Sequence, residues 1–185
     1  MTELLLDRVA SPIGTLPIVV DGARLCLLDL HDDEASVARS LAARYGTYRL
    51  REAGDPAGVA SALRAYFAGD LTALDGVEVD TGGTEFQRAV WRALREIPAG
   101  TTETYGALAR RLGKPDAARA VGITNGLNPV AIVVPCHRVI GANGSLTGFG
   151  GGLPRKQWLL EHEGLHFRNG VKVAPSAQLA FGLAL

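Results

Sequence analysis

The sequence has few of the features that mark secreted, metal-binding or membrane proteins. Its two cysteines, Cys26 and Cys136, lie far apart, which favours a reducing compartment over a disulfide between them. No CxxC pair occurs, and Cys26 with His31 supplies too few ligands for a usual structural zinc site, so no metal is predicted. No apolar run approaches the roughly 18 residues of a membrane span, and the N-terminus lacks a signal-peptide pattern. The sequence therefore indicates a cytoplasmic protein with no membrane partner.

A net charge is also lacking, because 19 Lys and Arg balance 19 Asp and Glu among the 185 residues. This balance argues weakly against a nucleic-acid partner, but it hides an asymmetry. Residues 1–80 have a net charge of −6, and residues 81–185 have a net charge of +6. Such a difference favours an acidic module joined to one that meets a polyanion, with chance as the alternative.

The first half of the chain predicts strands followed by helices. Residues 4–31 contain apolar runs separated by turn signals such as Asp21-Gly22, which predicts strands broken by turns. Helices are predicted over residues 33–45 and 57–70 from their apolar spacing. An extended connector is then expected over residues 71–83, with the boundary between two subdomains after residue 82.

The second half predicts several helices. Thr84 lies three residues before Gln87, a capping-box pattern that begins a helix. Two short helices follow at 107–112 and 116–125 across a tight turn, which is the helix-turn-helix pattern, with Asp116 as the predicted N-cap of the second. Small residues dominate that second helix, and Arg119 is the long side chain expected in its middle. A helix of this kind can approach a backbone or a narrow groove closely.

The stretch "AIVVPCHRVIG" at 131–141 places a thiol and an imidazole after an apolar run that predicts a buried strand. A thiol is a nucleophile only as thiolate. Cys136 and His137 would point to opposite faces of an extended segment, so a bridging water is expected between them. A histidine acting as a base needs a carboxylate behind it, which Glu161 or Glu163 could supply. An inert buried thiol is the alternative.

Three stretches together resemble one family, the DNA O6-alkylguanine alkyltransferases. They are "TETYGALARRLG", "AARAVGITNGLNP" and "VVPCHRVIGANGSLTGFGGGLPRKQWLLEHEG". The resemblance implies an α/β fold with an N-terminal RNase H-like sheet domain over residues 1–82. A mostly helical domain with a winged-helix-like helix-turn-helix would follow over residues 83–165. Residues 166–185 fit no part of the resemblance, so they are a tail of unknown role.

The resemblance also implies an activity. Members of the family repair O6-methylguanine by moving the alkyl group to their own cysteine, once per molecule and without a cofactor. The implied partner is double-stranded DNA, bound through the minor groove after the damaged base is flipped out. O4-alkylthymine is a further candidate substrate. The chain is expected to be a monomer, with cooperative binding on DNA as a further option.

Motif positions give the implied roles of the catalytic residues. Cys136, in "PCHRV", matches the alkyl acceptor. His137, a water and Glu163 match the relay that makes the thiolate. Asn128, in "LNP", matches the asparagine that braces the active-site turn.

Other positions match DNA and base contacts. Tyr105 would donate a proton to guanine N3, and Arg119 would fill the stack after the base leaves. The remaining implied DNA contacts are Ala120, Gly122 and Asn125. The implied base pocket is lined by Val139, Thr147, Gly148, Phe149, Gly150 and Gly151. Two positions depart from common family patterns, since Leu127 replaces a frequently basic residue and Phe149 replaces a frequent tyrosine.

Three alternatives use the same residues differently. A non-catalytic relative that only binds damage would lack the cysteine, which is present here. A cysteine hydrolase would use Cys136 and His137 over many turnovers and would need no Arg119. A regulator of the adaptive response would need a cysteine-rich zinc domain, which this sequence lacks.

Overall fold

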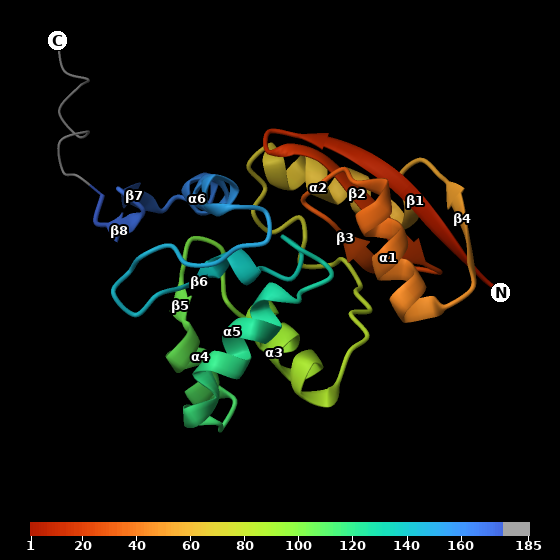
Figure 1. Ribbon diagram of the computed structural model, residues 1–185. Coiled ribbons are helices and arrows are strands. Elements are labelled where there is room, and N and C mark those ends of the chain that lie inside the picture. The colour runs from red at the N-terminus through yellow and green to blue at the C-terminus, as the bar shows by residue number, and fades with distance from the viewer. Residues whose placement is uncertain (176–185) are drawn as a thin grey trace, which may run out of the picture.

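The computed structural model describes residues 1–175, so the predicted tail lies only partly within it. The chain begins with a four-stranded sheet of order β3-β2-β1-β4 (Figure 1). Only the β1–β4 pair is parallel, and the other neighbours are antiparallel. The strands are β1 (Thr2–Ser11), β2 (Gly14–Asp21), β3 (Arg24–Leu28) and β4 (Tyr48–Glu52). The sequence does not reveal β4, because this edge strand is mostly exposed and has no buried face to create an apolar alternation.

Two helices cover the two faces of this sheet, close to where the sequence predicts them. Helix α1 (Glu34–Tyr45) begins at Asp33, whose side chain accepts a hydrogen bond from the backbone of the first turn. It packs on one face in a cluster with residues of β1, β2 and β3. Helix α2 (Val59–Phe67) follows a 3₁₀ turn (Pro56–Gly58) and belongs to the larger core on the other face.

The connector after α2 differs from the extended segment that the sequence predicts. Residues 71–76 form consecutive turns, and Asp70 supports the first of them by accepting hydrogen bonds from the backbone and hydroxyl of Thr72. Val79 then forms a single bridge with Leu25. The division of the chain after residue 82 stays a prediction.

The second half is mostly helical. Thr84 and Gln87 form the predicted capping box at the start of α3. The helices are α3 (Glu85–Arg95), α4 (Tyr105–Arg111), α5 (Ala118–Gly126) and α6 (Leu153–His162). Two short pairs of strands complete this half: β5 (Glu103–Thr104) with β6 (Val139–Ile140), and β7 (His166–Arg168) with β8 (Val171–Val173).

The start of α5 differs from the prediction in two ways. Pro115 begins a 3₁₀ turn (Pro115–Ala117), so Asp116 lies inside that turn and is not the N-cap. The cap position is Ala117, which makes no side-chain bond. Arg119 consequently lies in the first turn of α5 instead of its middle.

The apolar run before Cys136 is a buried turn, and the prediction of a strand there is wrong. The Val134 amide donates to the Val130 carbonyl at 3.0 Å, so the chain reverses within five residues. Ile132 at the corner has a φ of 70°, a left-handed conformation that is rare for a β-branched residue. The run looks like a strand in the sequence because the core surrounds it on all sides, which removes any periodicity.

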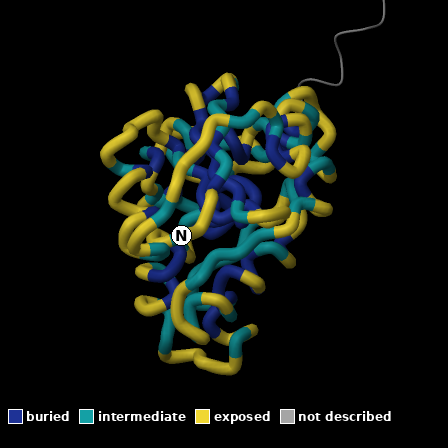
Figure 2. The backbone as a smooth tube through the Cα atoms, turned by 90° about the vertical axis from the view of Figure 1, so that its right-hand side faces the viewer, coloured by how far each residue is buried: buried dark blue, intermediate teal, exposed yellow. Residues whose placement is uncertain are grey.

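The two halves of the chain share one hydrophobic core. The buried segments gather in the middle of the molecule (Figure 2). The main cluster includes Val9 and Tyr66 from the first half and Val90, Val134 and Leu159 from the second. Cys136 belongs to this cluster, so residues of both halves pack around the segment that carries it. Within residues 1–175, no helix is long and apolar enough to cross a membrane.

Candidate active site

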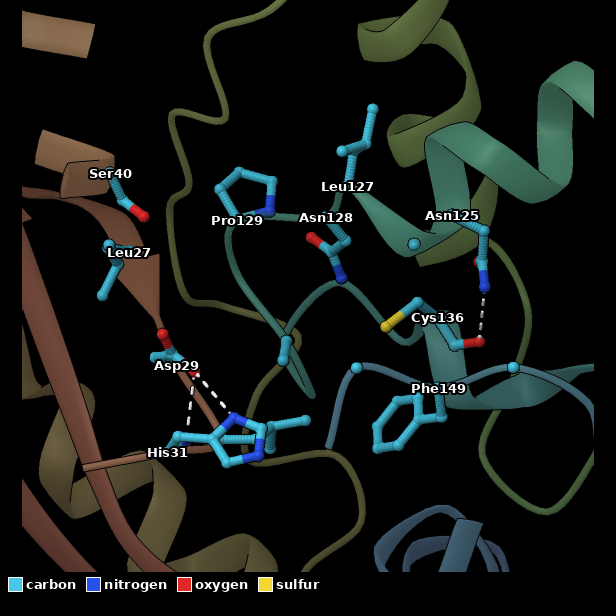
Figure 3. A pocket seen from close by; sticks show the side chains of 15 residues that line it. Leu27, Asp29, His31, Ser40, Asn125, Leu127, Asn128, Pro129, Cys136 and Phe149 are labelled. Atoms are coloured by element: carbon cyan, nitrogen blue, oxygen red, sulfur yellow. Dashed lines mark hydrogen bonds and ion pairs between the residues drawn. The ribbon is translucent and has the colours of Figure 1, made fainter. Parts of the chain in front are cut away.

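Cys136 begins a single 3₁₀ turn (Cys136–Arg138) directly after the buried turn. Its side chain is only 5% exposed, and its Sγ points into a pocket of about 310 Å³ (Figure 3). Burial raises the pKa of the thiol, while the Asn128 side chain and the Lys156 charge act in the opposite direction. The thiol therefore needs a nearby base to become a thiolate at neutral pH.

Asn128 closes the turn that carries the cysteine. Its Nδ2 donates to the Val134 carbonyl at 2.7 Å, and its Oδ1 accepts from the Val130 amide at 3.0 Å. One side chain thus ties both ends of the turn together. This is the bracing position that the family resemblance implies.

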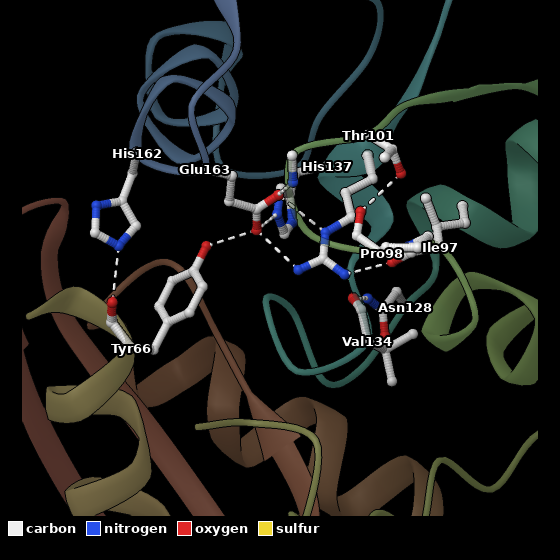
Figure 4. A network of polar contacts seen from close by, with 11 residues as sticks. Tyr66, Ile97, Pro98, Thr101, Asn128, Val134, His137, His162 and Glu163 are labelled. Carbon is white, nitrogen blue, oxygen red and sulfur yellow. Dashed lines mark hydrogen bonds and ion pairs between the residues drawn. The ribbon is translucent and has the colours of Figure 1, made fainter. Parts of the chain in front are cut away.

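His137 is completely buried and lies within a polar network (Figure 4). Its Nε2 is 2.9 Å from Oε1 of Glu163, and its Nδ1 has no hydrogen-bond partner among the described residues. Burial lowers the pKa of the imidazole, so the ring is neutral at neutral pH. If Nε2 donates to the carboxylate, Nδ1 holds a free lone pair and can act as a base.

Glu163 is the centre of this network. It accepts from Arg138 through Nε at 3.0 Å and Nη2 at 2.9 Å, and from the Tyr66 hydroxyl at 2.8 Å. Burial alone would raise the pKa of the carboxyl, but the hydrogen bonds from His137 and Arg138 and the positive charge of Arg138 bring it well below its usual range. Glu163 is therefore ionised at neutral pH and fixes the orientation of His137.

The structure distinguishes between Glu161 and Glu163, the two carboxylates that the sequence offers as partners of His137. Glu161 is exposed and accepts a hydrogen bond from Gln157 at 2.8 Å on the outside of α6. Residues two apart on a helix point about 200° apart, so only one of the pair can face the interior. That residue is Glu163, just past the end of α6.

Three buried residues of the site were not among the predicted ones. Arg138 and Tyr66 hold Glu163, and Tyr66 comes from α2, far away in sequence. Lys156 is also fully buried, and its Nζ donates to the carbonyls of Val139 (2.6 Å) and Thr147 (2.7 Å). Burial lowers the pKa of Lys156 to about 8. No local pattern marks such residues, since Lys and Arg usually lie at the surface.

Tyr105 is the first residue of α4 and faces α5. Its hydroxyl accepts a hydrogen bond from Oγ1 of Thr147 at 3.2 Å. A Cβ on Gly122 would lie 3.6 Å from the Tyr105 ring, so α5 runs directly beside it. Arg119 and Ala120 are exposed on the outer side of α5.

Some predicted residues lie elsewhere than expected. The sequence predicts a DNA contact for Asn125, whereas its side chain is 3% exposed and donates to the Cys136 carbonyl at 3.2 Å. The α5 helix turns this residue inward, where it supports the cysteine.

Gly148, Phe149 and Gly150 line the pocket as expected, whereas Val139, Thr147 and Gly151 lie outside its lining. The first half of the chain contributes unpredicted lining residues: Leu27, Asp29, Leu30, His31 and Ser40.

Tyr66→Phe tests whether the first half of the chain supports the buried carboxylate. The change removes the hydrogen bond to Glu163 without leaving a large cavity. We expect the free energy of unfolding to fall by about 2 kcal/mol, because hydrogen bonds to charged groups are stronger than neutral ones. Urea unfolding measures this.

Tyr48→Phe is the matched control, since within residues 1–175 the Tyr48 hydroxyl makes only an exposed bond, at 3.4 Å to the Ala38 carbonyl. It should change stability by less than about 0.5 kcal/mol. Equal effects of the two substitutions would show that the Tyr66 hydroxyl contributes nothing particular to the network.

Comparisons with known proteins agree over nearly the whole described chain. A family model described as "6-O-methylguanine DNA methyltransferase, ribonuclease-like domain" matches residues 6–81. One described as "6-O-methylguanine DNA methyltransferase, DNA binding domain" matches residues 85–165. The methylated-DNA–protein-cysteine methyltransferase of Salmonella typhimurium is 48% identical over 167 residues, which cover 89% of this chain and 98% of the relative.

Solved structures are similar as well. The O6-methylguanine methyltransferase of Mycobacterium tuberculosis has a TM-score of 0.74 at 42% identity, covering 97% of this chain and 99% of that one. A structure from the same organism in complex with DNA has a TM-score of 0.72 at 44% identity, covering 87% of this chain and 92% of that one.

Proposed function

The chain belongs to the 6-O-methylguanine DNA methyltransferase family, and from this premise we propose that it repairs duplex DNA with Cys136 as the alkyl acceptor. The observation that carries the proposal is the geometry at this residue. Its Sγ points into a pocket, while the adjacent His137 is held by an ionised Glu163 and has an Nδ1 without a hydrogen-bond partner within residues 1–175. A neutral base with this orientation suits the activation of a neighbouring thiol.

The proposed reaction starts with the thiol proton. His137 Nδ1 takes it through a bridging water, and Glu163 stabilises the imidazolium that forms. Sγ then attacks the alkyl carbon, the carbon–O6 bond breaks, and its electron pair stays with guanine. Tyr105 gives a proton to guanine N3, which disperses the charge of the leaving base. The alkyl donor is the DNA itself, so the step needs no cofactor.

DNA binding is proposed to use the exposed side of α5 in the minor groove. A base inside a duplex cannot reach a buried thiol, so it must be flipped out at a cost of a few kcal/mol. Arg119 would enter the stack in its place and offset part of that cost. We propose that the chain acts as a monomer in the cytoplasm.

A count of repaired lesions tests this proposal against a hydrolase. The protein is incubated with an excess of duplex that contains one O6-methylguanine. We expect repair to stop at about one lesion per protein molecule, because the described lining of the pocket holds no second thiol that could remove the methyl group from Cys136. Continued turnover would identify a true hydrolase or transferase instead.

A further inference from the structure

Helix α5 presents one row of large side chains on its exposed face. Arg119, Ile123 and Leu127 follow at intervals of four residues, so they lie on the same side of the helix. Ile123 is 58% exposed and Leu127 is 57% exposed. Apart from Met1, they are the most exposed large apolar residues of the part that the structure describes. Neither side chain is needed to fill the core, so the row calls for a function at the surface.

The row leads to the pocket. Leu127, at the C-terminal end of α5, lines the same pocket as Cys136 (Figure 3). Leu127 lies eight positions after Arg119, which corresponds to about 12 Å along the helix axis. Between these side chains the helix carries small residues, namely Ala120, Gly122 and Gly126. The two apolar side chains therefore protrude beyond the small side chains around them on this face of the helix.

We propose that Ile123 and Leu127 form an apolar ridge that inserts into the minor groove of duplex DNA beside the flipped nucleotide. This inference rests on the proposed function. DNA is the proposed partner because the ridge begins next to a cation, Arg119, and ends at Leu127, at the edge of the pocket that must receive the base. Apolar wedges of Leu and Ile are used by minor-groove proteins to open base steps.

The ridge changes the kind of contact that DNA meets at this position. A basic side chain would bind phosphate and release counterions, whereas Leu127 cannot. The ridge should therefore add affinity that does not depend on salt. It should also help to hold open the step from which the damaged base leaves, since partly unstacked DNA costs less to flip.

The test compares binding of Ile123→Ala, Leu127→Ala and the double variant to a duplex with a single O6-methylguanine, in the background of Cys136→Ser to prevent transfer. We expect the double variant to bind at least tenfold more weakly at every salt concentration. The slope of log Kd against log salt should stay unchanged. Leu127→Arg should increase that slope by about one, because the added cation releases about one more counterion from the DNA.

Two controls keep the result decisive. Leu50→Ala removes an exposed apolar residue of β4 and should leave binding unchanged. With Cys136 restored, reaction with free O6-benzylguanine should be unaffected by Ile123→Ala, because the free base needs no flipping. If the double variant bound DNA within twofold of the parent, the proposal that the ridge binds DNA would be overturned. The exposed face would then suit a protein partner. A slower reaction of Ile123→Ala with the free base would show that this residue supports the pocket, and this result would also overturn the proposal. If the parent bound DNA but transferred no alkyl group, only the proposed function would fail.

Discussion

Glu163→Gln is expected to slow alkyl transfer about 100-fold, within the range in which general acid–base groups act. The substitution keeps the shape of the side chain but removes the charge that orients His137 and stabilises its protonated form. It also leaves the guanidinium of Arg138 buried without a counterion. Breaking such a buried pair costs about 3 kcal/mol of unfolding free energy. Single-turnover kinetics and urea unfolding measure the two effects separately.

Glu161→Gln is the matched control, because this carboxylate is exposed and, within residues 1–175, accepts a side-chain hydrogen bond only from Gln157. It should alter the rate less than twofold and the stability by less than about 0.5 kcal/mol. Equal rates for the two variants, at a temperature where both are folded, would remove Glu163 from the relay.

Glu163→Gln should also change how the free energy of unfolding depends on pH. The pKa of Glu163 is depressed in the folded state, so its contribution is present at neutral pH and is lost as the pH falls below about 4, the usual glutamate range. The pKa of His137 is also depressed, by burial. A second, separate part of the stability is therefore lost at higher pH, as the pH falls through the usual histidine range. Glu163→Gln should remove the first component and enlarge the second, because the Glu163 carboxylate no longer opposes the lowering of the His137 pKa by burial.

Arg119→Lys is expected to slow transfer from duplex DNA by about tenfold or more, since a lost contribution of about 1.4 kcal/mol to flipping corresponds to one factor of ten. Arg119 is exposed in the first turn of α5 and makes no hydrogen bond or ion pair within residues 1–175. Its planar guanidinium can stack and bond in place of the departed base, whereas an ammonium cannot. Single-turnover kinetics on duplex and on free O6-benzylguanine measure the effect.

Two results would give Arg119 another role. If the defect disappears at low salt, the side chain acts by general attraction to phosphate. If the free base reacts as slowly as the duplex, the side chain supports the fold or the pocket. The finger role requires a defect that persists at low salt and is confined to the duplex.

Much of the fold was predictable because its signals are local. The Thr84 capping box and the Asp33 cap begin helices where the sequence places them. The buried turn before Cys136 was not predictable, since the core surrounds all of its residues and hides the reversal at Ile132. The edge strand β4 lacks a buried face and so lacks a pattern.

The candidate site was predictable only in part. The family resemblance selects Glu163, and the structure places that carboxylate beside His137. Tyr66 and Arg138 could not be found from spacing, because their contacts with Glu163 arise from the packing of distant segments. For Asn125 the prediction was wrong, since this polar residue of the helix proposed to bind DNA is turned inward and donates to the Cys136 carbonyl.

The identity of the alkyl acceptor is the central claim, and mass spectrometry tests it directly. The protein is incubated with a duplex bearing one O6-methylguanine, and its intact mass and peptides are measured. We expect one added methyl group, confined to the peptide that contains Cys136 and absent from the peptide with Cys26. Both thiols are buried in the free protein, but only Cys136 lies on the pocket. Methylation of Cys26, or methylation that survives Cys136→Ala, would contradict the account.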